Sequence, residues 1–216
     1  IQGETTTIPV TLDDIIYHTR AVRRGVERAH VVADMPCMSY QTGVQDALQN
    51  AGRLLKEGNA ESVKLEGGVE LAETVDRFVR AGIPVMGHIG LTPQSINQLG
   101  GFRAQGKTAI AAKRLVEDAI ILEGAGCFSI VLESVPARLA ELISKKISIP
   151  TIGIGAGVGC DGQVLVTHDL LGLFDRFTPK FVKKYANFHG EMQKAFGDFI
   201  EDVESKRFPA LEHTVE

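Results

Sequence analysis

Short apolar runs alternate with longer amphipathic stretches along most of the chain. From residue 30 onward, each run is followed by a polar or glycine-rich loop and then by apolar positions three and four residues apart. This is the pattern of repeated β–α units, and runs that are apolar almost throughout favour parallel strands covered on both faces. Six strands are predicted, at residues 30–34, 62–66, 84–88, 128–133, 151–155 and 163–168.

The pattern changes in the last fifth of the chain. After Gly172 the apolar residues, many of them phenylalanine, recur at helical spacing without a further strand. This predicts a C-terminal helical segment over residues 178–206, either one long helix or a pair broken near Gly190. Because no linker or low-complexity tract is visible, residues 1–216 are predicted to form a single domain.

Six β–α strands leave two α/β architectures open. A closed (β/α)8 barrel of the TIM type needs eight strands, so this chain would be a barrel lacking its first two units. The alternative is an open doubly wound sheet, which in a dinucleotide-binding protein carries G-x-G-x-x-G after a strand. The nearest match begins at Gly153 and Gly155, and it has Val158 in place of the third glycine. The fingerprint therefore fails.

Composition narrows the class of protein further. Lys and Arg number 23 against 27 Asp and Glu, so the net charge of −4 does not favour nucleic acid as a partner. No apolar stretch approaches the ~20 residues of a membrane-spanning helix. The three cysteines, Cys37, Cys127 and Cys160, are widely spaced and form no CxxC pair. This spacing favours a reducing compartment, and we expect a cytoplasmic protein.

Acidic residues end three of the predicted strands, where packing would call for an apolar side chain. They are Asp34, Glu66 and Glu133; His88 ends a fourth strand, and Lys64 shares the face of Glu66 because it lies two residues earlier. The carboxyl ends of parallel strands converge on one rim, where active sites lie. One such acid alone is often a helix cap or a surface ion pair, but four strand ends together indicate a site.

Oxygen ligands without cysteine suit a hard cation. Mg²⁺ usually takes one or two carboxylates and leaves other positions to water and substrate, which a keto acid could fill. The metal would then polarise the carbonyl and stabilise an enolate. Glu133 stands apart from the other two acids and is the candidate base. The next residue, Ser134, is expected to cap the following helix, with Pro136 in its first turn.

Several motifs together resemble the ketopantoate hydroxymethyltransferase family of the pantothenate pathway. The most specific is the run Gly-His-Ile-Gly-Leu-Thr-Pro-Gln-Ser at residues 87–95. The others occur in order over nearly the whole chain: residues 11–24, 33–36, 63–68, 132–136, 152–157, 161–163, 168–169, 208–209 and 212–213.

The resemblance implies a (β/α)8 barrel of the phosphoenolpyruvate/pyruvate superfamily and an enzyme that transfers a hydroxymethyl group. The donor would be 5,10-methylenetetrahydrofolate, the acceptor 3-methyl-2-oxobutanoate and the cofactor Mg²⁺. Carried over residue by residue, Asp34 and Glu66 resemble metal ligands, and Asp34 also resembles a substrate contact. Lys64 resembles the residue that meets the keto acid, His88 a hydrogen-bonding partner and Glu133 the proton acceptor.

The resemblance also implies two strand–helix units ahead of Gln2, the second ending in Gly-Asp-Ser, with its Asp on the metal and its Ser on the substrate. We therefore expect this chain to lack those groups and two barrel strands, and a homo-oligomer, as in the decamers of the family. Two alternatives stay open. One is another Mg²⁺-dependent carbon–carbon lyase or aldolase acting on a small 2-oxo acid. The other is an inactive assembly subunit, or a chain inactive on its own.

Overall fold

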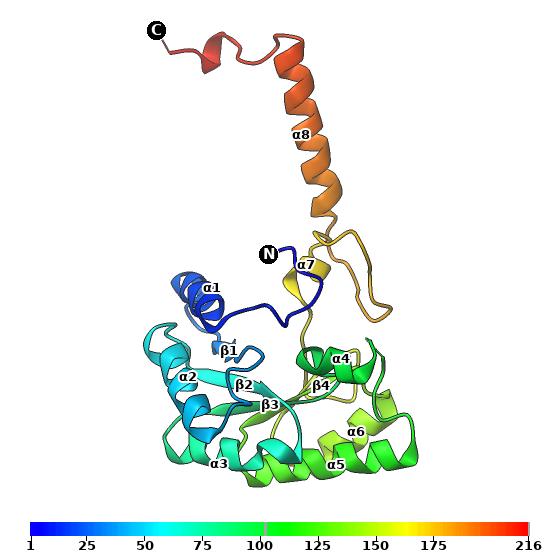
Figure 1. The fold of residues 1–216 in the computed structure, drawn as a ribbon. Coiled ribbons are helices and arrows are strands. Elements are labelled where there is room, and N and C mark those ends of the chain that lie inside the picture. The colour runs from blue at the N-terminus through cyan, green and yellow to red at the C-terminus, as the bar shows by residue number, and fades with distance from the viewer. Residues whose placement is uncertain (102, 216) are drawn as a thin grey trace. The chain divides into compact units, whose positions relative to one another are not determined.

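One curled parallel sheet organises the first part of the chain. The computed structural model describes residues 1–101 and 103–215, with the backbone alone at Leu99. All neighbouring strands in the sheet run parallel, and their spatial order follows their order along the chain (Figure 1). The strands are β1 (Val32–Asp34), β2 (Ser62–Glu66), β3 (Val85–Gly90), β4 (Ser129–Glu133), β5 (Thr151–Ile154) and β6 (Gly162–Gln163).

This strand order decides between the two architectures that the sequence left open. A doubly wound sheet reverses its strand order at a switch point, whereas consecutive right-handed crossovers place all helices on one side and curl the sheet toward a barrel. The observed order, β1 to β6 without reversal, excludes the doubly wound sheet. The fold is α/β with a curled half-barrel of six strands, as in a TIM-type fold.

A layer of helices covers the outer face of this sheet (Figure 1). The layer consists of α2 (Val44–Lys56), α3 (Ala72–Arg80), α5 (Ala109–Gly124) and α6 (Ala137–Lys146), with the 3-10 turn Val69–Leu71 ahead of α3. Their apolar faces meet the outward side chains of the strands in one core, which includes the fully buried Leu54, Phe78, Leu122 and Ile143. This packing leaves the inner face and the strand ends for polar residues.

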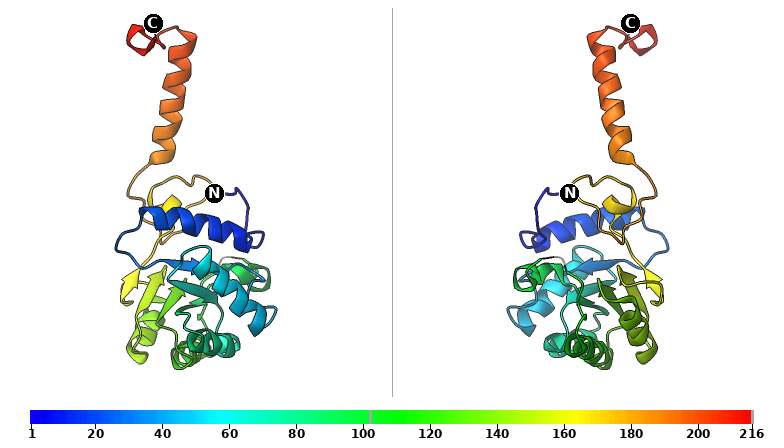
Figure 2. Two further views of the ribbon diagram at one scale, coloured as in Figure 1. Left: turned by 90° about the vertical axis from the view of Figure 1, so that its left-hand side faces the viewer. Right: turned by 90° about the vertical axis from the view of Figure 1, so that its right-hand side faces the viewer.

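Helix α1 (Leu12–Gly25) is not one of these four helices; it packs against α2 and β1 and is the blue helix in Figure 2. Its start is fixed by a capping box in which Thr11 and Asp14 exchange hydrogen bonds. Two short helical segments, the 3-10 turn Pro93–Ser95 and α4 (Ile96–Leu99), follow β3. They place the Thr92–Ser95 segment close to the carboxyl end of β2, where Gln94 contacts Glu66.

Two local predictions are wrong. The sixth strand was expected over 163–168, but β6 comprises only Gly162–Gln163, and α7 (Thr167–Leu170) begins a few residues later. Ser134 does not cap α6, because the cap position is Pro136. Ser134 instead adopts a positive φ of 50°, and its N–H donates to the carbonyl of Ile154. The turn after Glu133 is thereby tied to the end of β5.

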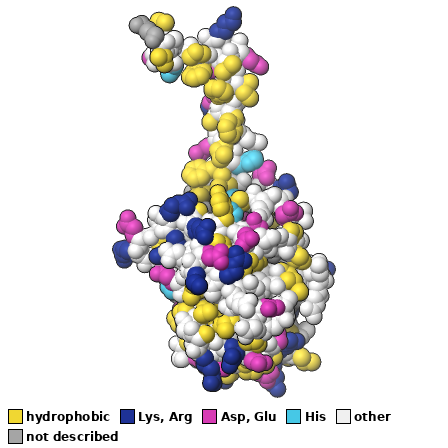
Figure 3. Space-filling model, turned by 60° about the vertical axis from the view of Figure 1, so that its left-hand side comes forward, with side chains coloured by type: hydrophobic (Ala, Val, Ile, Leu, Met, Phe, Trp, Pro, Cys, Tyr) yellow, Lys and Arg dark blue, Asp and Glu magenta, His cyan; other side chains and the backbone are white. Residues whose placement is uncertain are grey.

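Residues 165–216 form a second compact unit. Its main element, α8, spans Phe188–Glu204, so the helix is shorter than the predicted segment 178–206, and Gly190 lies in its first turn rather than at a break. No residue of α8 is buried. Figure 3 shows apolar side chains along this helix. The exposed apolar residues are Phe188, Met192, Phe196, Phe199, Ile200 and Val203. Among the described residues, no helix is both long and apolar enough to cross a membrane.

Candidate active site

Strand register aligns the polar residues at the carboxyl ends of four neighbouring strands. Asp34 on β1 is paired with Lys64 on β2, and Glu66 on β2 is paired with His88 on β3. Glu133 ends β4 beside the end of β3. Alternation along β2 sends Val63 and Leu65 into the core, so Lys64 and Glu66 share the opposite face. The parallel pairing thus brings the ends of all four strands to one rim.

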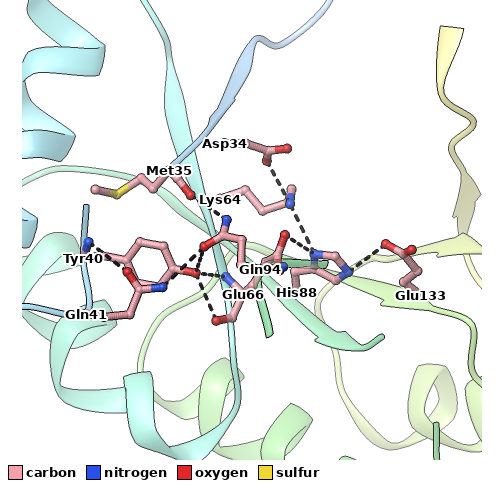
Figure 4. A network of polar contacts seen from close by, with 9 residues as sticks. All are labelled: Asp34, Met35, Tyr40, Gln41, Lys64, Glu66, His88, Gln94 and Glu133. Carbon is pink, nitrogen blue, oxygen red and sulfur yellow. Dashed lines mark hydrogen bonds and ion pairs between the residues drawn. The ribbon is translucent and has the colours of Figure 1, made fainter. Parts of the chain in front are cut away.

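Lys64 links the acid of β1 to the histidine of β3 (Figure 4). Its Nζ lies 2.9 Å from Oδ1 of Asp34 and 3.2 Å from Nδ1 of His88. The Asp34 side chain is 55% exposed, whereas that of Lys64 is only 14% exposed. The ammonium is therefore enclosed, while the carboxylate of Asp34 faces solvent and is free to meet a ligand.

His88 stands between two carboxylates and is almost fully buried. Its Nδ1 lies 3.8 Å from Oε1 of Glu66, and its Nε2 lies 3.2 Å from Oε2 of Glu133. An ammonium that donates to Nδ1 favours the neutral ring with its hydrogen on Nε2. That hydrogen then points toward the Glu133 side, although Nε2 makes no aligned hydrogen bond among the described residues. The imidazole ring therefore lies between Glu133 on its Nε2 side and Lys64 and Glu66 on its Nδ1 side.

Burial and charge act in opposite directions on the two polar residues of β2. Burial lowers the pKa of Lys64, but attraction to the carboxylates of Asp34 and Glu66 outweighs it, so the net shift is upward and the ammonium stays charged. Burial raises the pKa of Glu66, and the positive charge of Lys64 offsets part of that rise. A cation near Glu66 would stabilise its ionised form.

Gln94 and Tyr40 hold the acid of β2 from the other side (Figure 4). The backbone N–H of Gln94 donates to Oε2 of Glu66 at 2.9 Å, and its side-chain amide donates to the carbonyl of Met35 at 2.8 Å. The Tyr40 hydroxyl donates to Oε1 of Gln94 at 2.8 Å, and the N–H of Glu66 donates to that hydroxyl at 3.2 Å. The loops after β1 and β3 therefore both contact the end of β2.

A cleft of about 410 Å³ opens beside Glu66. Its walls come from the loop after β2, the segment after β3 and the first turns of α5. The volume is that of a small-molecule site. Polar lining residues outnumber apolar ones and include Glu66, Glu70, Thr92, Ser95, Gln98, Gln105, Arg114 and Asp118.

The donor set fits a divalent cation of the Mg²⁺ type. Asp34 contacts the Lys64 ammonium, and Glu66 and Glu133 lie on either side of His88, so that with a neutral His88 the three carboxylates and one ammonium carry two negative charges in excess. Among residues 1–101 and 103–215 there is no group of three or more His, Cys, Asp or Glu arranged to hold a metal. Mg²⁺ does not need one, because one or two carboxylates with water and substrate complete its shell. Asp34 and Glu66 would supply those two.

The structure brings together all five residues that the sequence singled out: Asp34, Lys64, Glu66, His88 and Glu133. Sequence reasoning missed Tyr40 and Gln94, which bond to this cluster. A signal for Gln94 was present, because it follows a proline in the run after β3, where a polar side chain lies close to the strand ends. Tyr40 gave no such signal, since a tyrosine in a loop is usually read as packing.

A parallel half-barrel with an acid–lysine–histidine cluster at the carboxyl ends of its strands is the arrangement of a βα-barrel enzyme. A solved structure shares this fold. It is a Burkholderia cenocepacia J2315 protein proposed to be a phosphonomutase, with a TM-score of 0.55 at 10% identity, covering 89% of this chain and 79% of that one.

The chain belongs to the ketopantoate hydroxymethyltransferase family, whose model matches residues 1–211. The resemblance drawn from the motifs is thereby confirmed, and the chain is of the hydroxymethyltransferase class. An Enterococcus faecalis protein named 3-methyl-2-oxobutanoate hydroxymethyltransferase is 61% identical over 98% of this chain and 77% of its own length. A Syntrophus aciditrophicus protein of the same name is 57% identical over 99% of this chain and 79% of its own length.

Proposed function

We propose that this protein transfers a hydroxymethyl group from 5,10-methylenetetrahydrofolate to 3-methyl-2-oxobutanoate, giving ketopantoate for pantothenate biosynthesis. The observation that carries the proposal is the cluster at the strand ends, where Glu133 is held 3.2 Å from His88 and apart from the Lys64–Asp34 pair. Membership of the family supports the substrates. The cluster offers separate groups to bind a keto acid and to remove a proton from it.

Substrate binding falls to the β1 and β2 residues. The Lys64 ammonium, charged and enclosed, would neutralise the carboxylate of the keto acid. Asp34, the more exposed partner, would contact the substrate and, with Glu66, hold Mg²⁺. When bound, Mg²⁺ would withdraw electron density from the keto oxygen and make the neighbouring C3 proton more acidic.

Glu133 would act as the base. Its carboxylate takes the C3 proton, and the electron pair of the C3–H bond moves into the enolate of the substrate. Water adds to the one-carbon unit, and both of its bonds to the folate nitrogens break, which releases formaldehyde and tetrahydrofolate. The enolate carbon then attacks the carbon of formaldehyde, and the resulting alkoxide takes the proton back from Glu133 to give the hydroxymethyl group. The His88 ring, whose Nε2 lies 3.2 Å from Oε2 of Glu133, would keep this base apart from Lys64 and Glu66. A positioned base is worth about 10²–10⁴-fold in rate.

The cleft beside Glu66 supports a two-substrate reaction. At about 410 Å³ it lies within the range of small-molecule sites, and it would give part of the folate a place beside Glu66, the one residue of the cluster that lines it. An aldolase or lyase acting on one oxo acid needs no such second site. Dependence on the folate therefore separates this proposal from that alternative.

Three broader features belong to the same proposal. We expect the six strands to correspond to six of the eight in a closed barrel, since β1 and β6 are the edges of the described sheet. Copies of the chain would form a homo-oligomer, such as a decamer, because α8 exposes a row of apolar side chains. A cytoplasmic location agrees with the three free cysteines.

Proton removal can be tested without the folate. The protein, Mg²⁺ and 3-methyl-2-oxobutanoate in D₂O should lose the C3–H signal in the proton NMR spectrum, and Glu133→Gln should abolish that loss. Undiminished exchange by the variant would remove Glu133 from the role of base. Adding 5,10-methylenetetrahydrofolate should then yield ketopantoate by mass spectrometry. Exchange without folate-dependent product would favour a different reaction on the same keto acid.

A further inference from the structure

We propose that Gln94 is a positioning residue that fixes the two carboxylates of Asp34 and Glu66 relative to one another. The inference rests on the proposed function in one respect, namely that these two carboxylates hold Mg²⁺. Gln94 itself touches neither metal nor substrate in this assignment. It acts through the ends of β1 and β2, which it joins from a third segment, the turn after β3.

Gln94 makes contacts in two directions at once. Its backbone N–H donates to Oε2 of Glu66 at 2.9 Å, so it holds one oxygen of that carboxylate. Its side-chain Nε2 donates at 2.8 Å to the carbonyl of Met35, the residue directly after Asp34. One residue therefore sets the position of the Glu66 carboxylate and of the backbone that carries Asp34.

Tyr40 fixes the orientation of the Gln94 amide. The tyrosine hydroxyl, buried within the loop after β1, donates to Oε1 of Gln94 at 2.8 Å. A flipped amide would set its oxygen against the Met35 carbonyl oxygen, and the Tyr40 hydroxyl would have to turn its hydrogen from Oε1 of Gln94 to the Glu66 carbonyl, 3.2 Å away. Since the Met35 contact then becomes repulsive, the amide has one favourable orientation.

The arrangement leaves the other oxygen of Glu66 available. Oε2 is taken by the Gln94 N–H, while the nearest cation-forming group to Oε1 among the described residues is the His88 ring, at 3.8 Å. A hydrogen bond to one oxygen turns the carboxylate plane and presents the second oxygen to a ligand. Partners of this kind are typically worth about 10–100-fold in metal affinity.

The test measures Mg²⁺ binding to the protein by titration calorimetry, together with thermal unfolding in the absence of Mg²⁺. Gln94→Met keeps the length of the side chain and removes its polar atoms, and it should raise the Mg²⁺ dissociation constant about 10-fold. Tyr40→Phe deletes a single oxygen atom and should raise it about 5-fold. Because the Tyr40 and Gln94 side chains act as one unit, the double variant should bind Mg²⁺ no more weakly than Gln94→Met alone.

Two reference variants separate the outcomes. Asp34→Asn should lose Mg²⁺ affinity if the metal assignment is right, and Gln45→Ala, an exposed glutamine on α2, should change nothing. Full affinity in folded Gln94→Met and Tyr40→Phe, with affinity lost in Asp34→Asn, overturns the role of Gln94 and leaves the proposed function standing. Failure of the unaltered protein to bind Mg²⁺ overturns the metal site itself and this role with it. Additive effects of Gln94→Met and Tyr40→Phe would show that they do not form one unit.

A purely structural role predicts a different result. It would lower the unfolding temperature of Gln94→Met without Mg²⁺ and leave the dissociation constant of the folded variant unchanged. Should Gln94→Met fail to fold, Tyr40→Phe carries the test alone, because it leaves the packing of the ring in place. Unchanged Mg²⁺ affinity in Tyr40→Phe would then overturn the proposal.

Discussion

Oδ1 of Asp34 lies 2.9 Å from Nζ of Lys64, directly across the β1–β2 pairing. The contact is asymmetric, because the ammonium is enclosed and the carboxylate is half exposed. Removing the lysine would therefore affect the buried neighbours more than Asp34. The most affected group is Glu66, whose pKa is already raised by burial and held down in part by Lys64.

Lys64→Met should destabilise the protein by ~3 kcal/mol near pH 8, at the lower end of the cost of breaking a buried ion pair since Asp34 is half exposed. Without the ammonium, the pKa of Glu66 rises further. The folded variant then binds a proton more tightly than the unfolded chain, so its stability deficit should shrink as the pH falls through that raised pKa. Urea unfolding at pH 5 and pH 8 measures the change.

The matched control is Lys145→Met, which breaks an exposed pair with Glu141 one helical turn away. Surface pairs of this kind contribute ~0.5 kcal/mol or less. A deficit for Lys64→Met that is equally small, or that grows on acidification, would contradict the view of Lys64 as the counter-charge of a buried carboxylate.

The sequence predicted the site better than the elements around it. Alternation along β2 placed Lys64 and Glu66 on one face, and the convergence of parallel strand ends brought them to His88 and Glu133. These relations depend only on local periodicity and on the parallel order of the strands. Because both could be inferred from one sequence, the cluster could be found before the structure was known.

Contacts between loops could not be predicted in this way. Gln94 meets Met35 across 59 positions of sequence, and no local pattern encodes such a partner. The apolar run after Gln163 was misread for a related reason: its residues resemble a strand, but the ladder to β5 ends after Gly162 and Gln163. The predicted cap at Ser134 failed because the turn after Glu133 is set by its bond to Ile154.

Gly90 lies on β3, next to Glu133 on β4, and the substitution Gly90→Ala should displace Glu133. Gly90 has a φ of 96°, which favours glycine, and an added Cβ would collide with the carbonyl oxygen of Glu133 and with Val135. We expect a stability loss of about 2 kcal/mol from backbone strain, and slower proton exchange of the keto acid because Glu133 moves. Thermal unfolding and the NMR exchange assay measure the two effects.

Gly52→Ala serves as the control for that substitution. Gly52 lies inside α2, and a Cβ there meets nothing within 4 Å. Alanine is the better helix former, so this variant should gain about 0.5–1 kcal/mol and keep full exchange activity. If Gly90→Ala were as stable and as active in proton exchange as Gly52→Ala, the close approach of β3 to Glu133 would not contribute to stability or to activity.

Asp118→Asn should change how stability depends on pH. Burial raises the pKa of Asp118 above its ordinary 3.8, and the N–H of Val69, which donates to its Oδ1 at 2.9 Å, offsets part of that rise. Because the folded state binds the proton more tightly, the unaltered protein should lose stability as the pH rises above 3.8 through the raised pKa. Asparagine keeps the acceptor for Val69 and does not titrate.

At pH 8 the free energy of unfolding of Asp118→Asn should therefore equal that of the unaltered protein or exceed it by up to about 1 kcal/mol. This difference should shrink as the pH falls toward 4. Urea unfolding across that range measures it. Glu117 is an exposed neighbour of Asp118 on α5. The free energy of unfolding of Glu117→Gln should stay within about 0.5 kcal/mol of that of the unaltered protein at every pH. A gap for Asp118→Asn that widened in acid would mean that its carboxylate is stabilised when ionised, contrary to the effect of burial.

Phe196→Glu should reduce the mass of the assembly if α8 joins copies of the chain. Phe196 is 63% exposed and lies in the apolar row of α8, so a charge there costs little in a single chain but much in a buried interface. Light scattering after gel filtration measures the mass. Lys194→Glu makes a larger charge change on the opposite, polar face of the helix and should leave the mass unaltered. Equal masses for all three proteins would show that the apolar row of α8 is not an interface, and that association, if present, uses another surface.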